Sequence, residues 1–116
     1  MEKEFDVVGI GSPLLDIVYN VEDSFLEELK LVKGGFISIN KEESKKIIER
    51  LGYYKPSINL GGSCSNTLAG ITNLGGKTAF FGKIGDDEYG NIYESQTIET
   101  GVESKLSRHK NELTGH

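Results

Sequence analysis

The residues with the clearest chemical potential form the run GGSCSN, residues 61–66, which stands where an apolar segment changes to a helical pattern. Glycines favour tight turns and let the backbone come close to other groups. Ser63 suits the start of a helix, where the first N–H groups lack partners and can bind an anion or a hydroxyl. The run therefore indicates a binding site for hydroxyl groups. The alternative is that the glycines only turn the chain and Ser63 only caps the helix.

Two other glycine-containing segments match nucleotide-binding motifs only in part. Gly9 and Gly11 follow an apolar run, but Leu14 stands where a dinucleotide-binding fingerprint needs its third glycine. The run Gly76-Lys77-Thr78 ends like a phosphate-binding loop, but Ile71 replaces the first glycine and a strand pattern follows. The sequence therefore predicts neither of these two sites.

Composition and charge exclude several classes of protein. The 116 residues are 36% hydrophobic and 27% charged, which is typical of one globular domain. The net charge is −5 and the basic residues are scattered among acidic ones, so nucleic acid is not expected as a partner. Cys64 is the single cysteine and is expected to be a small packing residue in a reducing compartment. No signal-peptide pattern or membrane-length apolar run occurs, so a cytoplasmic protein without a membrane partner is expected.

Apolar runs and turn signals predict an α/β protein. Residues 5–10 and 78–84 have the continuous apolar pattern of buried parallel strands. Residues 16–21 and 35–39 alternate between apolar and polar, which favours half-exposed strands of a separate small sheet.

Four segments have helical signals. A short helix is predicted over residues 23–31 with Asp23 or Ser24 as its cap, and a second over residues 41–51 with a capping box. That capping box is formed by Asn40 and Glu43. Helices over residues 63–74 and 88–100 end at glycines, and Asp86 and Asp87 at the start of the last helix are expected to stabilise it rather than to act as catalytic acids.

The end of the chain is less informative. Residues 102–116 are polar, and neither His109 nor His116 has an evident partner there. Two parallel core strands with their helices do not make a sheet covered on both faces. The chain is therefore expected to be the N-terminal portion of a longer protein.

The glycines and their neighbours, taken together, resemble the N-terminal signature of the ribokinase or PfkB family of carbohydrate and nucleoside kinases. Cys64 and Leu68 stand where the ribokinase pattern favours small residues, and with residues 12–17 and 23–31 they look more like the adenosine kinase branch. A sugar kinase is the open alternative. The positions that carry the resemblance are Gly9, Gly11, Asp16, Gly61-Gly62, Asn66, Leu74-Gly75, Phe81-Gly82-Lys83, Gly85-Asp86-Asp87, Gly90, Gly101-Val102 and Thr114-Gly115.

This resemblance implies a ribokinase-like three-layer α/β/α core with an inserted β-sheet lid. The lid strands would lie near residues 16–22, 35–39 and 56–60, and a homodimer through the lid sheet is a further expectation. The implied reaction is ATP-dependent transfer of a phosphoryl group, assisted by Mg²⁺, to a hydroxymethyl group of a sugar or nucleoside. The family's general base lies in a Gly-Ala-Gly-Asp segment that this sequence lacks, so the chain alone is expected to be inactive and to bind no metal.

The resemblance also assigns residues to the acceptor. Asp16 would accept hydrogen bonds from vicinal hydroxyls, Gly61 and Gly62 would leave room for the sugar, and Asn66 would bind another hydroxyl. The alternatives are that Asp16 is a turn residue and that Asn66 bonds nearby backbone. A noncatalytic sugar- or nucleoside-binding module would use the same residues.

Three further residues are candidates for the acceptor pocket, namely Ser12, Leu14 and Ile37. Leu14 and Leu15 precede Asp16, and a leucine placed against a flat base would favour a nucleoside over a simple sugar. Packing of these leucines into the core is the alternative.

Overall fold

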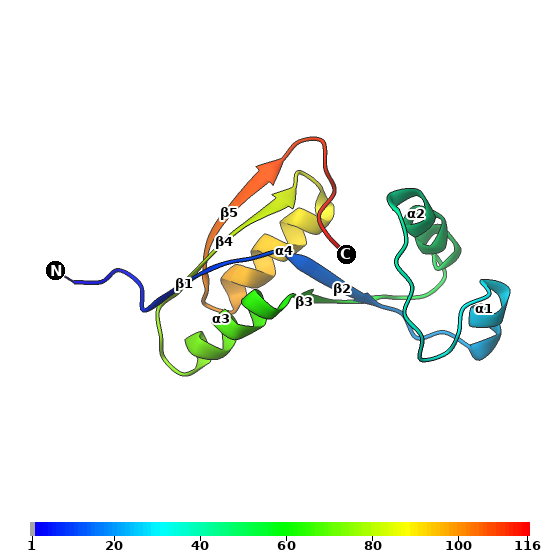
Figure 1. Ribbon diagram of the computed structural model, residues 1–116, viewed down its shortest axis with the longest axis horizontal. Helices are drawn as coiled ribbons and strands as arrows, with labels where there is room; N and C mark the ends of the chain where they lie inside the picture. The colour runs from blue at the N-terminus through cyan, green and yellow to red at the C-terminus, as the bar shows by residue number, and fades with distance from the viewer. Residues whose placement is uncertain (1) are drawn as a thin grey trace. The chain divides into compact units, whose positions relative to one another are not determined.

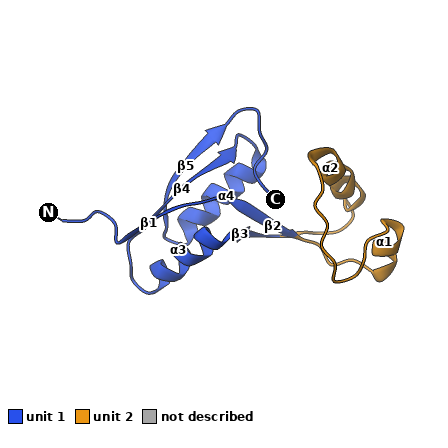
Figure 2. Cartoon of the chain, viewed as in Figure 1, with its two compact units in different colours: residues 1–17, 58–116 blue, residues 18–57 orange. Residues whose placement is uncertain are grey.

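The computed structural model describes residues 2–116, which form two compact units. Unit 1 contains the residues up to Ile17 together with Ile58–His116, and unit 2 contains Val18–Ser57 (Figure 2). In the described part of the chain, no helix combines the length and the apolar character that a membrane span requires.

Unit 1 is built on a three-stranded parallel sheet (Figure 1). Strand β4 (Thr78–Gly85) lies between β1 (Val7–Ile10) and β5 (Glu103–His109) and is parallel to both. Helix α3 (Ser63–Asn73) precedes β4, and α4 (Glu88–Glu99) connects β4 to β5. Parallel strands need such crossover connections, and the predicted α/β core is confirmed.

The two helices of unit 1 end as their sequences predict. Gly75 follows α3 with φ of 95°, and Gly101 follows α4 with φ of 87°. This left-handed region is easily reached by glycine, which lets the chain leave each helix. Asp87 is the N-cap of α4, so its predicted role at the start of a helix is confirmed.

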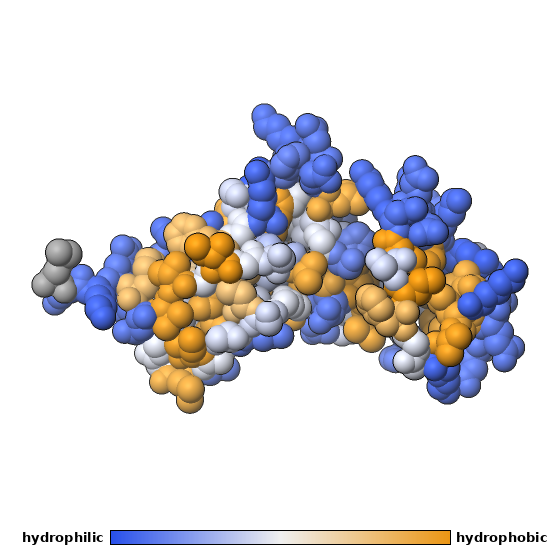
Figure 3. Space-filling model, in the orientation of Figure 1, coloured by the Kyte–Doolittle hydropathy of each residue, from blue (hydrophilic) through white to orange (hydrophobic). Residues whose placement is uncertain are grey.

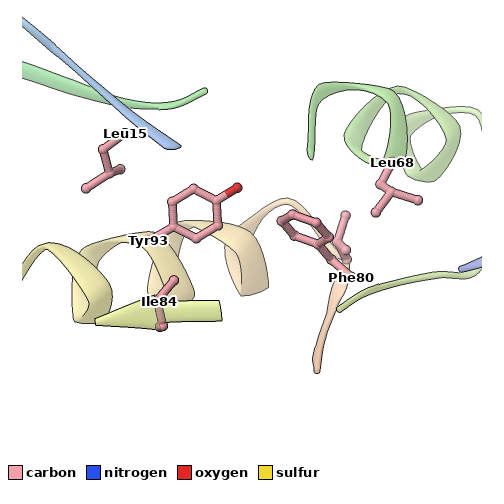
Figure 4. Packing of buried hydrophobic residues seen from close by; sticks show 6 residues of the cluster. Leu15, Leu68, Phe80, Ile84 and Tyr93 are labelled. Atoms are coloured by element: carbon pink, nitrogen blue, oxygen red, sulfur yellow. The ribbon is translucent and has the colours of Figure 1, made fainter. Parts of the chain in front are cut away.

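Both helices pack on the same face of the sheet. Gly9 of β1 lies beside Phe80 of β4, and a Cβ atom on Gly9 would be 2.7 Å from atoms of both Cys64 and Leu68 of α3. The Phe80 ring also lies 6.3 Å from that of Tyr93 of α4, and Figure 4 shows it between Leu68 and Tyr93. Gly9 therefore serves close packing of a helix on the sheet, and Cys64 is a packing residue as expected.

Residues 2–116 leave the other face of the sheet uncovered. Ile10 is 84% exposed, and Val8 and Phe81 on the same face also remain at the surface. Orange areas on unit 1 in Figure 3 mark such exposed apolar residues. Parallel sheets are normally covered on both faces, so this chain supplies two of the three expected layers.

Strands β2 (Leu14–Val18) and β3 (Ser57–Gly61) form a separate two-stranded sheet. They overlap two of the three segments expected to form the lid, and the lid itself stays a prediction. The prediction of a strand over residues 35–39 is wrong, since these residues belong to no strand. Phe36 is 95% exposed, and no described strand pairs with this segment, so its alternating pattern has neither a hydrogen-bonding neighbour nor a surface to pack on.

Unit 2 contains α1 (Asp23–Glu28) and α2 (Lys41–Arg50). The predicted capping box is confirmed: the Glu43 amide donates to Asn40 Oδ1 at 2.9 Å, and the Asn40 amide donates to Glu43 Oε2 at 3.0 Å. The predicted cap of α1 is wrong, because its N-cap is Glu22 and no side chain caps it.

The polar segment after α4 is anchored, contrary to the expectation from sequence. All of β5 pairs with β4, and Val102 just before it is buried. The ring of His116 lies 5.1 Å from that of Tyr89. The segment is polar because alternate residues of β5 are exposed, so backbone pairing rather than an apolar stripe holds it.

Candidate functional site

Asp16 lies on β2, beside the end of β3. Leu15 points into the core and is 2% exposed, whereas Asp16 points the opposite way and is exposed. A Cβ atom on Gly61 would lie 2.8 Å from Oδ1 and 3.0 Å from Oδ2 of Asp16. Gly61 therefore leaves room for the Asp16 carboxylate, which forms no hydrogen bond or ion pair with residues 2–116.

Gly62 is the N-cap of α3 and has φ of 92°, a conformation that favours glycine. The alternative in which Ser63 caps the helix is wrong, because Ser63 is the first helical residue and no side chain caps this helix. The first N–H groups of α3 are therefore available to a ligand. A Cβ atom on Gly62 would lie 3.0 Å from the carbonyl oxygen of Ser12, so the loop after β1 lies against this turn.

Asn66 lies one turn into α3 and is exposed. Its backbone N–H donates to the Gly62 carbonyl at 3.1 Å, which is an ordinary helical bond. Its side-chain amide forms no hydrogen bond with the described residues, so it does not bond nearby backbone. The amide can thus both donate to and accept from a ligand.

The three candidate pocket residues have different surroundings. Ser12 is exposed next to the Gly62 turn. Leu14 is 43% exposed, and its Cδ2 atom would be 2.7 Å from a Cβ atom on Gly115. Ile37 belongs to unit 2, where it lines a hollow of about 390 Å³ with Leu26 of α1 and residues 30–36. The structure therefore brings Ser12, Asp16, Gly61 and Gly62 together within unit 1.

Asp87 is engaged entirely by protein donors. It accepts from the Gly90 amide at 2.7 Å, from the Thr114 hydroxyl at 2.6 Å and from the Thr114 amide at 2.9 Å. Burial acts to raise the pKa of Asp87, but the donors from Thr114 and Gly90 and the charge of His116 outweigh it and hold the pKa below its ordinary value. Both oxygens of this carboxylate thus already accept hydrogen bonds from the protein.

The described residues contain no preformed cluster of metal ligands. Nowhere in residues 2–116 do three His, Cys, Asp or Glu side chains come together in a way that could hold a metal ion. No residue of this chain is therefore assigned here as a ligand of Mg²⁺.

Thr114 is a residue for which no individual role was predicted from the sequence. It is 1% exposed and joins the segment after β5 to the start of α4. The only signal in the sequence is the Thr114-Gly115 pair that contributes to the family resemblance. No local sequence pattern identifies its hydrogen-bond partner Asp87, which lies 27 residues earlier.

Several known proteins that are similar to this chain are kinases. Residues 54–116 match the family described as pfkB family carbohydrate kinase. The 5-dehydro-2-deoxygluconokinase of Bacillus licheniformis is 31% identical over 103 residues, which are 89% of this chain and 24% of that protein. The structure of adenosine kinase from Sinorhizobium meliloti has a TM-score of 0.72 and 33% identity, covering 96% of this chain and 34% of that one. A probable sugar kinase from Rhizobium etli CFN 42 has a TM-score of 0.69 and 31% identity, covering 98% and 32%. The chain thus spans about a quarter to a third of these proteins.

Proposed function

Because the chain belongs to the PfkB family of carbohydrate kinases and has the ribokinase-like fold of adenosine kinases, we propose that the whole protein transfers a phosphoryl group from ATP to a hydroxyl group of a sugar or nucleoside. In this proposal, the present chain binds the acceptor. The cytoplasmic location and the homodimer through the lid sheet stay predictions.

The observation that carries the proposal is the exposed Asp16 carboxylate, which has no partner among residues 2–116 and lies against Gly61. A carboxylate can accept hydrogen bonds from two neighbouring hydroxyls, and charge-assisted bonds are stronger than neutral ones. The uncapped first turn of α3 follows Gly61 directly and offers N–H donors to oxygen atoms. Together these groups supply the acceptors and donors that a sugar ring requires.

Phosphoryl transfer depends mainly on positioning and on neutralising charge around the transferred group. ATP and Mg²⁺ would supply the phosphoryl group and part of that neutralisation. The residues of this chain would hold the acceptor by its ring hydroxyls, which fixes the orientation of its reacting hydroxyl group. No residue of this chain is proposed as the general base.

The identity of the acceptor, nucleoside or simple sugar, is best tested with a substitution of Leu14. Since Leu15 lies in the core, Leu14 is the leucine at the start of β2 that a flat base can contact. We propose a nucleoside acceptor, with a simple sugar as the alternative. The test compares kcat/KM of the full-length protein for adenosine, inosine, ribose and fructose, before and after Leu14→Ser. A nucleoside kinase prefers adenosine or inosine by about tenfold or more and loses part of that preference in the variant.

The central experiment is Asp16→Asn in the full-length protein. Loss of a charge-assisted hydrogen bond costs about 1.5–3 kcal/mol, so the acceptor KM should rise by roughly one to two orders of magnitude while the ATP KM changes little. Glu99→Gln is the matched control, because Glu99 is an exposed carboxylate at the far end of α4. An unchanged acceptor KM in Asp16→Asn would refute the assignment. Acceptor binding without any turnover by the full-length protein would favour the noncatalytic module.

A further inference from the structure

The Asp87 carboxylate forms more hydrogen bonds than capping a helix requires. An N-cap side chain needs to satisfy one amide of the first turn, and the Gly90 amide fills that role. The same carboxylate also accepts from the hydroxyl and the amide of Thr114, at 2.6 Å and 2.9 Å. We call these two bonds the Asp87–Thr114 clasp.

The clasp joins the buried Thr114 to the partly buried Asp87, and two glycines make it sterically possible. The Thr114 hydroxyl accepts from the Gly85 amide at 2.9 Å, so this hydroxyl is bonded on both sides. A Cβ atom on Gly85 would collide with the Glu112 carbonyl oxygen, and one on Gly90 would collide with the Gly85 carbonyl oxygen. The segment around Thr114 is therefore held tightly between the end of β4 and the start of α4.

The segment held by the clasp lies beside β2 and bonds to it. The Leu15 amide donates to the Gly115 carbonyl oxygen at 2.9 Å, and Leu14 and Gly115 form a parallel bridge. A side chain on Gly115 would meet Leu14, since its Cβ atom would lie 2.7 Å from Leu14 Cδ2. Thr114 therefore places a backbone acceptor against the residue that immediately precedes Asp16.

Strand β2 is thus fixed on two sides. It pairs with β3, and Gly115 supplies a bond to the Leu15 amide. The Leu15 side chain is anchored in the core cluster, and alternation along the strand then sets the direction of Asp16. A shift of the Gly115 carbonyl would alter the backbone of Leu15 and, through it, the position of the Asp16 carboxylate over Gly61.

We propose that Asp87 and Thr114 are positioning residues for the acceptor site: their clasp holds Gly115 against Leu15 and thereby fixes the Asp16 carboxylate. This inference rests on the proposed function, in which Asp16 binds vicinal hydroxyls of a sugar or nucleoside. Misplacement of a binding group by about 1 Å can cost about a hundredfold in rate, so a residue without ligand contact can influence acceptor binding.

Substitutions of Asp87 and Thr114 can distinguish the effect of the clasp on the acceptor site from the effects of helix capping and of general stability. Asp87→Asn keeps an oxygen that can cap the Gly90 amide, but it directs an NH₂ group at the Thr114 amide and so breaks one bond of the clasp. Thr114→Val removes the hydroxyl at nearly constant shape, and Thr114→Ser retains it. Thr97→Val is the matched control, because Thr97 is also 1% exposed and its hydroxyl donates to the Tyr93 carbonyl within α4, at 2.8 Å.

The experiment measures KM for acceptor and for ATP, kcat, and hydrogen exchange of the Leu15 amide in the full-length protein. We expect Thr114→Val and Asp87→Asn to raise the acceptor KM about tenfold, to change the ATP KM by less than about twofold, and to speed exchange at Leu15. Thr114→Ser should restore the values of the parent protein. Thr97→Val should lower thermal stability without changing acceptor KM or exchange at Leu15.

The outcomes that overturn the inference are distinct from those that overturn the proposed function. If Asp16→Asn raises the acceptor KM but Thr114→Val and Asp87→Asn do not, the clasp does not position Asp16 and the proposed function stands. Equal effects of Thr114→Val and Thr97→Val, or of Thr114→Val and Thr114→Ser, also refute the clasp. If Asp16→Asn leaves the acceptor KM unchanged, both fail. Should Thr114→Val not fold, Asp87→Asn and its Leu15 exchange decide the question.

Discussion

Gly61→Ala tests the contact between Asp16 and Gly61 with the smallest change the chain allows. The added methyl group would lie 2.8 Å from Asp16 Oδ1, whereas ordinary van der Waals contact begins at 3.4 Å. The carboxylate must therefore move by about 0.6 Å or turn to another rotamer, which costs on the order of 0.5–1.5 kcal/mol. Gly61 is not among the glycines with positive φ, so alanine causes no backbone strain there.

The displaced carboxylate should bind the acceptor more weakly. If the movement forfeits one charge-assisted hydrogen bond, the loss is about 1.5–3 kcal/mol, and the acceptor KM should rise by roughly one to two orders of magnitude. Stability should change by only about 1 kcal/mol, because the atom displaced is the exposed end of a side chain. Steady-state kinetics with varied acceptor and with varied ATP, together with thermal unfolding, measures both effects.

Gly70→Ala is the matched control for this substitution. Gly70 lies within α3, and a Cβ atom there would meet nothing within 4 Å outside the helix backbone. Alanine at this position should stabilise the helix by about 0.5–1 kcal/mol and leave the acceptor KM unchanged. In an Asp16→Asn background, Gly61→Ala should add little, because the two changes act on one contact. The reasoning is refuted if Gly61→Ala yields a folded protein with an unchanged acceptor KM.

Three further predictions follow from the same structure. Leu15→Ala should lower the unfolding free energy by about 2–5 kcal/mol and Leu14→Ala by much less, as measured by urea unfolding; equal losses would contradict the assignment of Leu15 to the core. Because the folded-state pKa of Asp87 lies below the unfolded value of 3.8, its ionised form adds stability above that pH, and this contribution is lost as the pH falls through the lower folded-state pKa. Asp87→Asn should therefore make the loss of stability with pH less steep below 3.8, and parallel pH profiles of the two proteins would argue against the bonded carboxylate. The chain of 116 residues, purified alone, should not phosphorylate ribose, fructose or adenosine with Mg-ATP above a control without protein, and turnover abolished by Asp86→Asn would place the catalyst within this chain.

Elements with short-range causes could be predicted from the sequence. The capping box of Asn40 and Glu43 joins residues three apart, and the glycines after α3 and α4 end those helices through their own backbone angles. The apolar strand over residues 78–84 is recognisable because it is buried over most of its length. These features depend on neighbours within a few residues, so the order of residues along the chain contains most of the information.

Strands that depend on a partner were not predicted as well. Residues 103–109 have a polar pattern and become β5 because β4 offers them a line of backbone donors and acceptors. Residues 35–39 have a better strand pattern but meet no such partner among the described residues. Pairing decides between these two segments because a strand is stabilised by bonds to its neighbour rather than by its own residues.

The candidate site likewise has features that the sequence predicts and features that only the tertiary structure determines. The sequence alone marks residues 61–66 as a turn into a helix, and the family resemblance adds Asp16, but neither reveals that Gly61 is where the Asp16 carboxylate lies. The link from Asp87 to Thr114 spans 27 residues, and Gly115 reaches Leu15 across most of the chain. Such contacts come from the packing of strands and helices against one another, and a single sequence carries no local pattern for them. The tertiary structure alone therefore determines which glycines make room for a side chain and which hydrogen bonds hold the acceptor strand.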